Sequence, residues 1–374
     1  MKKLECSIFR GGTSKGIFIK EENLPKNKRE WDKILLAIMG SPDIRQIDGL
    51  GGATSTTSKV AIISKSNNKN WDINYTFAQV SIDKPIVTYK GNCGNISSAV
   101  GPYAIEKGLV KVTGDETLVR VYNTNTKKII YCYVKTKNGN VNYYGDFNIA
   151  GVPGTSTAVK LAFKNPAGSI TGKLLPTGNV IDILEIPGYG TIEASIVDSS
   201  NPLVFIRAND IGLTGKELPE EIDKSKDILD LLEKIRGIAA VKLGFIKNYK
   251  DSSTISPSIP KMTIIEKAKN YKDINGNIVE EKDIDILGRM MSMQLSHKTY
   301  AFTGALCTVT AASIDGTIVN KLVKKDFNRL NLRIGNPAGI IKVGVEKAEN
   351  NKDILWVYGY RTARIIMDGY VYIK

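Results

Sequence analysis

An internal repeat is the feature of this sequence that most constrains how the chain folds. Residues 7–19 resemble residues 194–206, since each segment has two apolar runs separated by a turn of small polar residues. The offsets between matching residues are near 200: 187 between Phe18 and Phe205, 204 between Gly40 and Gly244, and 202 between Lys59 and Lys261. A nearly constant offset predicts two homologous halves that face each other.

Strand signals in the chain are many and short, whereas helix signals are few. β-rich segments bounded by Gly, Pro and Asn predict strands at 6–9, 16–19, 60–63, 77–82, 129–134, 204–206 and 262–265. Helical spacing of apolar residues predicts helices at 28–39 and 227–241, and helices are also expected at 96–106 and from near Gly304. We therefore expect an α+β protein in which each half is a strand-rich shell around one helix.

Length and composition agree with a soluble two-domain protein. The chain has 374 residues, 42% of them hydrophobic and 24% charged, which excludes wholesale disorder. No run of about 18 apolar residues occurs, and Arg10 interrupts any signal-peptide core. The four cysteines are widely spaced and form no CxxC pair, so a disulfide framework is not indicated. These features predict a cytoplasmic protein.

The net charge of +14 suggests nucleic-acid binding, but its distribution argues against it. Of the 52 basic residues 41 are lysines, and they are spread along the whole chain without a basic tail or an arginine-rich helix. A solvated lysine surface with some preference for small anions is the favoured interpretation. The single histidine, His297, excludes sites that need two histidines, such as HExxH proteases and facial triads.

A cysteine stands just before the expected helix at 96–106, in the sequence Asn92-Cys93-Gly94-Asn95. Unpaired backbone N–H groups and the positive end of a helix dipole stabilise a thiolate in that position. A buried structural cysteine beside a turn is the alternative. Three other cysteines lie in apolar strand or helix contexts and are expected in the core: Cys6, Cys132 and Cys307.

Residues 51–59 form a run of small and hydroxylated residues that leads into a strand. Such a run offers N–H and hydroxyl donors to carboxylate or phosphate oxygens. It does not match GxxxxGK[ST] and no helix follows it, so a nucleotide P-loop is not expected. Lys59 at its end is a candidate base if the strand removes it partly from water, and a surface lysine is the alternative. The turn at 11–16 and the lone His297 are weaker signals on their own.

Ordered motifs run along nearly the whole chain. They are Gly11-Gly-Thr-Ser-Lys-Gly16, Gly40-Ser-Pro-Asp43, Arg45-Gln-Ile-Asp-Gly-Leu-Gly-Gly52, Thr57-Ser-Lys-Val-Ala61, Asn92-Cys-Gly-Asn95, Val100-Gly-Pro102, Leu175-Pro-Thr-Gly178, Asn201-Pro-Leu-Val-Phe205 and Ser292-Met293 with His297. Together these motifs resemble the PrpF family. The resemblance implies a diaminopimelate-epimerase-like fold of two pseudo-symmetric domains, each a barrel-like, mostly antiparallel sheet around a central helix. We expect the first domain at 1–187 with a returning strand at about 358–374, the second at 188–357, and the active site in the cleft between them.

The resemblance also implies a reaction, namely a cofactor-independent 1,3-proton shift in an unsaturated di- or tricarboxylate. Family activities include 2-methylaconitate cis-trans isomerase, 3-methylitaconate Δ-isomerase and 4-oxalomesaconate tautomerase. By motif position Lys59 is the first choice for the proton-transferring base, and Cys93 is either a second acid/base or a pocket wall. The second half has Thr303-Gly304-Ala305 at the matching helix start, with Cys307 displaced, which argues against a symmetrical two-thiol mechanism. The expected substrate-binding residues are Thr13, Ser14, Gly52, Ala53, Thr54, Ser55, Thr56, Gly94, Asn95, Asn201, Lys261, Ser292, Met293, His297 and Gly304.

Two other functions compete with this isomerase hypothesis. The chain could be a non-catalytic accessory protein of an aconitase-type iron–sulfur dehydratase, although four scattered cysteines offer no cluster-ligand pattern. Nucleic-acid binding on the basic surface predicts a steeply salt-dependent affinity. We expect no cofactor, no metal, no nucleic acid and no membrane partner, while a homo-oligomer and the identity of the polycarboxylate stay open.

Overall fold

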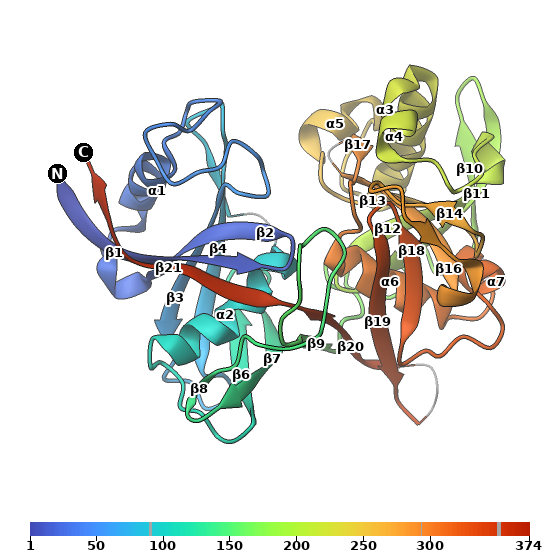
Figure 1. The fold of residues 1–374 in the computed structure, drawn as a ribbon. Coiled ribbons are helices and arrows are strands. Elements are labelled where there is room, and N and C mark those ends of the chain that lie inside the picture. The colour runs from blue at the N-terminus through green and yellow to red at the C-terminus, as the bar shows by residue number, and fades with distance from the viewer. Residues whose placement is uncertain (90–91, 293, 350–352) are drawn as a thin grey trace. The chain divides into compact units, whose positions relative to one another are not determined.

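The computed structural model describes residues 1–89, 92–292, 294–349 and 353–374. These residues form two compact units. Unit 1 comprises Met1–Phe163 and Tyr360–Lys374, and unit 2 comprises Lys164–Gly359. In Figure 1 the red C-terminal strand accordingly lies beside the blue N-terminal strand of unit 1. No described helix is both long and apolar enough to cross a membrane.

Unit 1 is a mixed sheet that curves around one helix. Its main strands, in the order in which they pair, are β21 (Ala363–Ile373), β1 (Lys2–Gly11), β2 (Ser14–Lys20), β3 (Lys59–Lys65), β4 (Ile73–Val80), β6 (Glu116–Asn123), β7 (Lys128–Lys137) and β9 (Val159–Lys164). The β2–β3 and β4–β6 pairs are parallel and the others are antiparallel. Short strands β5 (Val87–Thr88) and β8 (Asn140–Val141) and helices α1 (Trp31–Met39) and α2 (Gly94–Glu106) complete the unit.

Unit 2 repeats this arrangement. Its strands pair in the order β10 (Asp182–Ile186), β11 (Gly190–Asp198), β12 (Pro202–Arg207), β13 (Lys261–Lys267), β16 (Ile286–Ser292), β18 (Leu332–Asn336), β19 (Gly339–Lys347) and β20 (Ile354–Arg361). Here β12–β13 and β16–β18 are the parallel pairs, at the same two places in the order as in unit 1. The remaining strands and α-helices are β14 (Tyr271–Lys272), β15 (Ile278–Val279), β17 (Leu295–Ser296), α3 (Pro219–Lys224), α4 (Lys226–Lys242), α5 (Ser252–Ile255), α6 (Phe302–Ala312) and α7 (Ile318–Leu322).

One ion pair shows how closely the two units repeat each other. Asp72 accepts from Arg120 N at 2.7 Å and from Arg120 Nη2 at 2.7 Å. Asp285 accepts from Arg333 N at 2.7 Å and from Arg333 Nη2 at 2.6 Å. Both residues of the pair recur at an offset of 213, so the predicted internal repeat is present at the level of individual contacts.

The central helix of each unit is almost completely buried. In α2 every residue from Ile96 to Ile105 is buried, and in α6 every residue from Gly304 to Ala312 is buried. Gly101 allows α2 to lie close to β7, because a Cβ on it would come within 2.5 Å of Cys132 Sγ. The outer face of each sheet is covered by another helix, since α1 packs in one apolar cluster with β2 and β3 and α4 packs in another with β12 and β13. This confirms the expected α+β architecture of two shells around central helices.

The first junction between the units lies earlier than the predicted boundary at 187/188. The structure divides the chain after Phe163, because β10 pairs with β11 and Gly168 N donates to Asp198 O, which ties residues 164–187 to unit 2. The returning C-terminal segment joins unit 1 from Tyr360, close to the expected 358. The proline- and glycine-rich stretch is therefore the first part of unit 2 rather than the end of unit 1.

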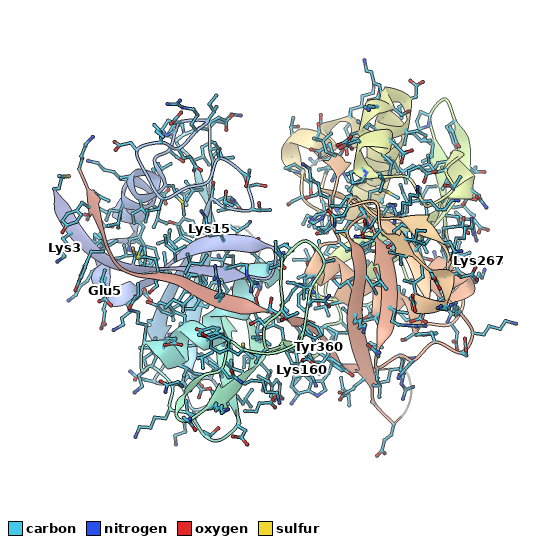
Figure 2. The ribbon with its side chains drawn as sticks, viewed as in Figure 1. Lys3, Glu5, Lys15, Lys160, Lys267 and Tyr360 are labelled. Atoms are coloured by element: carbon cyan, nitrogen blue, oxygen red, sulfur yellow. The ribbon has the colours of Figure 1, made fainter. Side chains whose placement is uncertain are left out.

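Lysine side chains project from both units, as Figure 2 shows for Lys3 and Lys160 in unit 1 and for Lys267 in unit 2. Lys3 and Lys267 are exposed. A dispersed lysine surface of this kind is what the sequence predicted for the +14 charge.

Candidate active site

The β1–β2 turn lies directly against the start of α2. A Cβ on Gly11 would collide with the backbone oxygen of Asn95, and a Cβ on Gly12 would collide with the side chain of Asn95. Gly12 also has a φ of 51°, in the left-handed region that favours glycine. The two glycines are therefore what brings Thr13 and Ser14 next to the first turn of the helix.

Arg361 joins this corner of unit 1 and was not identified from the sequence. Its Nε donates to Asn95 Oδ1 at 3.1 Å, and Asn95 Nδ2 donates to Thr13 Oγ1 at 3.0 Å. Arg361 is buried, and burial lowers the pKa of its guanidinium to about 9. A polar Arg-Thr pair in the middle of the apolar run at 354–373 was the available signal, but its partners lie about 270 residues away in sequence.

Lys59 lies at the start of β3 and is 9% exposed. Its Nζ donates to Gln79 Oε1 at 2.5 Å and lies 5.4 Å from the centroid of the Phe77 ring. The Gln79 amide is itself fixed, because its Nε2 donates to Ser58 O at 2.9 Å and to Ser55 O at 3.1 Å. Gln79 is thus a second residue that sequence reasoning missed, because its place opposite Lys59 follows from the antiparallel register of β3 and β4.

The β3 start, the β1–β2 turn and the α2 start meet at Gly16. A Cβ on Gly16 would lie 2.8 Å from Lys59 O and 3.0 Å from Ile96 Cδ1. The strand that carries Lys59 and the first turn of α2 therefore both pack against Gly16, where there is no room for a side chain.

The loop at 51–58 is held beside the β1–β2 turn by backbone and side-chain bonds. Lys15 N donates to Thr56 O at 2.9 Å. Gln46 Oε1 accepts from Ala53 N at 2.8 Å and from Ser58 Oγ at 2.9 Å. The residues between these anchors are exposed: Ala53, Thr54, Ser55 and Thr56.

Cys93 immediately precedes α2 and is partly buried, whereas the other three cysteines are buried, as predicted. Its carbonyl oxygen accepts from Ser97 N at 2.9 Å and from Ser97 Oγ at 3.0 Å. Burial raises the pKa of the Cys6 thiol to about 11 and that of Cys132 to about 12, so neither is suited to acid/base chemistry. Burial also raises the pKa of Cys307.

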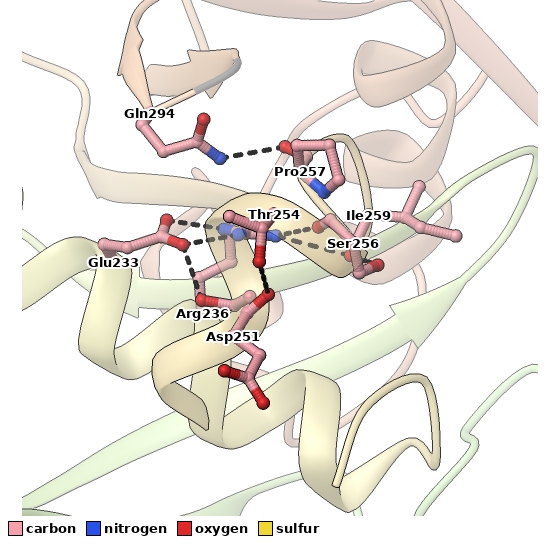
Figure 3. Close-up of polar contacts among 9 residues, drawn as sticks. Glu233, Arg236, Asp251, Thr254, Ser256, Pro257, Ile259 and Gln294 are labelled. Carbon is pink, nitrogen blue, oxygen red and sulfur yellow. Dashed lines mark hydrogen bonds and ion pairs between the residues drawn. The ribbon is translucent and has the colours of Figure 1, made fainter. Parts of the chain in front are cut away.

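Lys261 begins β13 in unit 2 and borders a small pocket with α4. Burial, together with the charge of Arg236, lowers the pKa of Lys261 to about 8. Arg236 is nearly fully buried, pairs with Glu233 at 2.5 Å and donates to Ser256 O at 2.7 Å, as Figure 3 shows. Gln294 and Pro257 also line this pocket, and Gln294 Nε2 donates to Pro257 O at 3.0 Å.

The remaining predicted residues of unit 2 lie at strand and helix ends. Ser292 ends β16, Asn201 lies in the turn before β12, and Gly304 lies in the first turn of α6. His297 N donates to Met290 O at 2.8 Å, and its Nδ1 accepts from Thr299 N at 3.0 Å. Met293 lies outside the described residues.

The structure therefore brings one set of predicted residues together inside unit 1. The set comprises Thr13, Ser14, Gly52 to Thr56, Lys59 and the Cys93–Asn95 helix start, with Gln79 and Arg361 added. Within the described ranges, no group of three or more His, Cys, Asp and Glu side chains is arranged to hold a metal ion. Hydroxyl, amide, backbone N–H and cationic groups dominate the set, which suits oxyanion recognition.

Comparison with known proteins decides the family. A family model described as PrpF protein matches residues 1–374. The chain belongs to the PrpF family. It is 46% identical to a 3-methylitaconate isomerase of Eubacterium barkeri, covering 100% of this chain and 97% of the relative. It is 38% identical to a 2-methyl-aconitate isomerase of Shewanella oneidensis, covering 99% and 96%.

Solved structures agree with these relatives. A methylitaconate-delta-isomerase crystal structure matches with a TM-score of 0.90 and 45% identity, covering 100% of this chain and 96% of that chain. A hydroxyproline epimerase from Agrobacterium vitis matches with a TM-score of 0.55 and 10% identity, covering 99% and 92%. The second likeness concerns the fold alone, and it confirms the epimerase-like fold of this PrpF member.

Proposed function

We propose that this protein catalyses a cofactor-independent 1,3-proton shift in an unsaturated di- or tricarboxylate such as 2-methylaconitate or 3-methylitaconate. The isomerase class follows from full-length relatives that are named isomerases. The observation that supports this chemistry best is Lys59. It is an almost buried lysine whose contacts in the described chain are a neutral amide and an aromatic ring rather than a carboxylate.

In the proposed reaction the unprotonated Lys59 amine takes a proton from the carbon γ to a substrate carboxylate. The electron pair of that C–H bond enters the conjugated system, the double bond shifts, and a dienolate forms. Lys59 then returns a proton at the α carbon, so no atom or electron is gained or lost. Because Gln79 Oε1 accepts from Nζ, the amine is held in one orientation while it transfers the proton.

Charge that develops on the substrate carboxylate needs preorganised donors. The N–H groups at the start of α2 include those of Gly94 and Asn95. They have no acceptor within the helix and lie at the positive end of its dipole. Thr13, Ser14, the partly buried Gly52 and the exposed residues 53–56 would bind a second carboxylate. In unit 2 the proposed contributors are Asn201, Lys261, Ser292, Met293, His297 and Gly304.

Cys93 has two roles open to it. As an acid/base it would exchange a proton with the substrate, and as a pocket wall it would only shape the site. Cys93→Ser and Cys93→Ala separate these roles, because loss of turnover in both variants supports the first and retained turnover in Cys93→Ala supports the second.

The experiment that tests the function is proton NMR in heavy water with 2-methylaconitate, 3-methylitaconate and oxalomesaconate. We expect deuterium to enter the α and γ positions of at least one acid without added cofactor, and Lys59→Ala to abolish this exchange. Normal exchange in Lys59→Ala would refute the lysine base. Absence of exchange on every acid, together with co-purification of an iron–sulfur dehydratase, would instead favour an accessory role. A cytoplasmic location and the oligomeric state are further proposals that cell fractionation and light scattering test.

A further inference from the structure

A hydrogen-bond relay in unit 1 runs from a buried cation to a hydroxyl. Arg361 Nε donates to Asn95 Oδ1 at 3.1 Å, and Asn95 Nδ2 donates to Thr13 Oγ1 at 3.0 Å. Arg361 is 6% exposed, and Asn95 lies in the first turn of α2. The relay thus connects the C-terminal end of β20 with the β1–β2 turn.

The direction of donation along this relay is fixed by Arg361. A guanidinium has donors and no acceptor, so Asn95 must turn its carbonyl oxygen toward it. The NH₂ group of Asn95 then faces Thr13, whose oxygen must accept. The hydroxyl proton of Thr13 is consequently left to donate to another group, and a carboxylate, which only accepts, is the matching ligand.

We propose that Arg361 is a positioning residue for substrate recognition, which acts through Asn95 to fix Thr13 as a hydrogen-bond donor to a substrate carboxylate. This inference rests on the proposed function, since that function supplies the carboxylate.

The surroundings of the relay hold its members in place. Arg10 Nη1 donates to Gly12 O at 3.0 Å and to Thr362 O at 2.9 Å, and Gly12 N donates to the same Thr362 oxygen at 2.9 Å. These bonds fasten the residue after Arg361 to the residue before Thr13. The lowered pKa of Arg361 still leaves it charged at neutral pH, so the relay begins at a desolvated cation that also favours an anion near the helix start.

The test is a double-mutant cycle on steady-state isomerisation of the acid that the enzyme turns over. Arg361→Met removes the donors, and Thr13→Val removes the hydroxyl. We expect each to raise KM about 10- to 100-fold with a smaller change in kcat, because a hydrogen bond to a charged group is lost. The double variant should be no worse than the more impaired single variant, because both changes remove the same interaction.

Two further variants separate positioning from mere structural support. Asn95→Asp replaces the donor amide by a group that only accepts, so Thr13 would donate to it rather than to substrate. We expect KM to rise although the new ion pair with Arg361 preserves the fold. Thr13→Ser keeps the hydroxyl and should restore a KM near that of the wild type.

The matched control is Arg289→Met in unit 2. Arg289 is 2% exposed and donates to Glu217 O at 2.6 Å and Lys216 O at 3.2 Å, so it supports a loop through backbone carbonyls. This variant should lower the melting temperature and leave KM unchanged. If Arg361→Met behaves in the same way, or if the cycle is additive, the relay is only structural and the inference is overturned.

Calorimetric titration with the saturated tricarboxylate tricarballylate keeps this inference separate from the proposed function. If the wild type binds tricarballylate, and Arg361→Met and Thr13→Val weaken binding by the same non-additive factor, the relay stands even where no acid is isomerised. If the wild type isomerises an acid but the cycle on KM and on the tricarballylate Kd is additive, the relay fails while the function stands. If the wild type neither isomerises nor binds these acids, both fail together.

Discussion

The two units of this protein share a scaffold and differ in chemistry. Asp72 with Arg120 and Asp285 with Arg333 occupy matching places, and in both pairs the carboxylate accepts from the main-chain N and from Nη2 of the arginine. Lys59 and Lys261 also match, since each begins the strand that runs parallel to the second strand of its hairpin. Their surroundings differ, because Lys59 contacts an amide and a ring whereas Lys261 lies near the charge of Arg236.

The starts of the two central helices, α2 and α6, also carry different side chains. In unit 1 the residues at the start of α2 are Cys93, Gly94 and Asn95, and Asn95 is linked to Thr13 and Arg361. In unit 2 the matching segment has Thr303 and Gly304, and Cys307 is fully buried one turn further on, where its Sγ donates to Val197 O at 3.3 Å. The repeated scaffold thus keeps the contacts that fold it, whereas the side chains at the start of the central helix differ between the two copies. We infer that proton transfer belongs to unit 1.

The largest expected effect comes from replacing each of the two matching lysines by alanine. Lys59→Ala should reduce deuterium exchange by about 10²–10⁴-fold, because it removes the proposed base. Lys261→Ala should retain exchange at saturating substrate and raise KM by about tenfold, because it removes only a cation that would bind a carboxylate. Both rates are measured by proton NMR in heavy water. Equal losses of exchange in the two variants would mean that the units share the chemistry symmetrically.

Much of this comparison could be predicted from the sequence, because repeats and helix-start motifs are local. The strand at Lys59 and the glycine turns depend on residues close together in the chain, and the repeat is found by comparing such short segments with one another. Gln79 and Arg361 could not be found in this way. The role of Gln79 depends on the register between β3 and β4, and that of Arg361 on the pairing of the C-terminal strand with β1. Neither feature leaves a periodic signal in the sequence. The boundary at 187 failed for a related reason, since a proline-rich stretch indicates irregular backbone but not the unit with which that backbone pairs.

A second pair of variants tests whether the repeated ion pairs stabilise both units equally. The Asp285 side chain is 4% exposed and the Asp72 side chain is 23% exposed. Asp285→Asn should therefore cost about 2–3 kcal/mol of unfolding free energy and Asp72→Asn about 1 kcal/mol, since buried charge-assisted hydrogen bonds are the stronger ones. Urea unfolding followed by circular dichroism measures both. Activity per folded molecule should stay unchanged, and a larger cost for Asp72→Asn would show that burial does not rank these pairs.

The smallest expected effect concerns the charge of Lys261. Its pKa of about 8 lies below the ordinary 10.5 because of burial and of nearby Arg236, with the Glu233 carboxylate already paired to Arg236. Between pH 8 and 10.5 the unfolded chain therefore binds more protons than the folded one, so this residue makes stability rise with pH in that window. Lys261→Met removes the titrating group and should be more stable than the wild type at pH 7, by a margin that shrinks by about 2–3 kcal/mol toward pH 10. Lys261→Arg is the matched control, because a guanidinium stays charged across this range. The stability difference between Lys261→Met and Lys261→Arg should therefore stay constant with pH.

The measurement is urea unfolding at pH 7, 8, 9 and 10. A constant difference between the wild type and Lys261→Met would mean that Lys261 does not lose its proton in this window, and the proposed contrast between the two lysines would then rest on contacts alone.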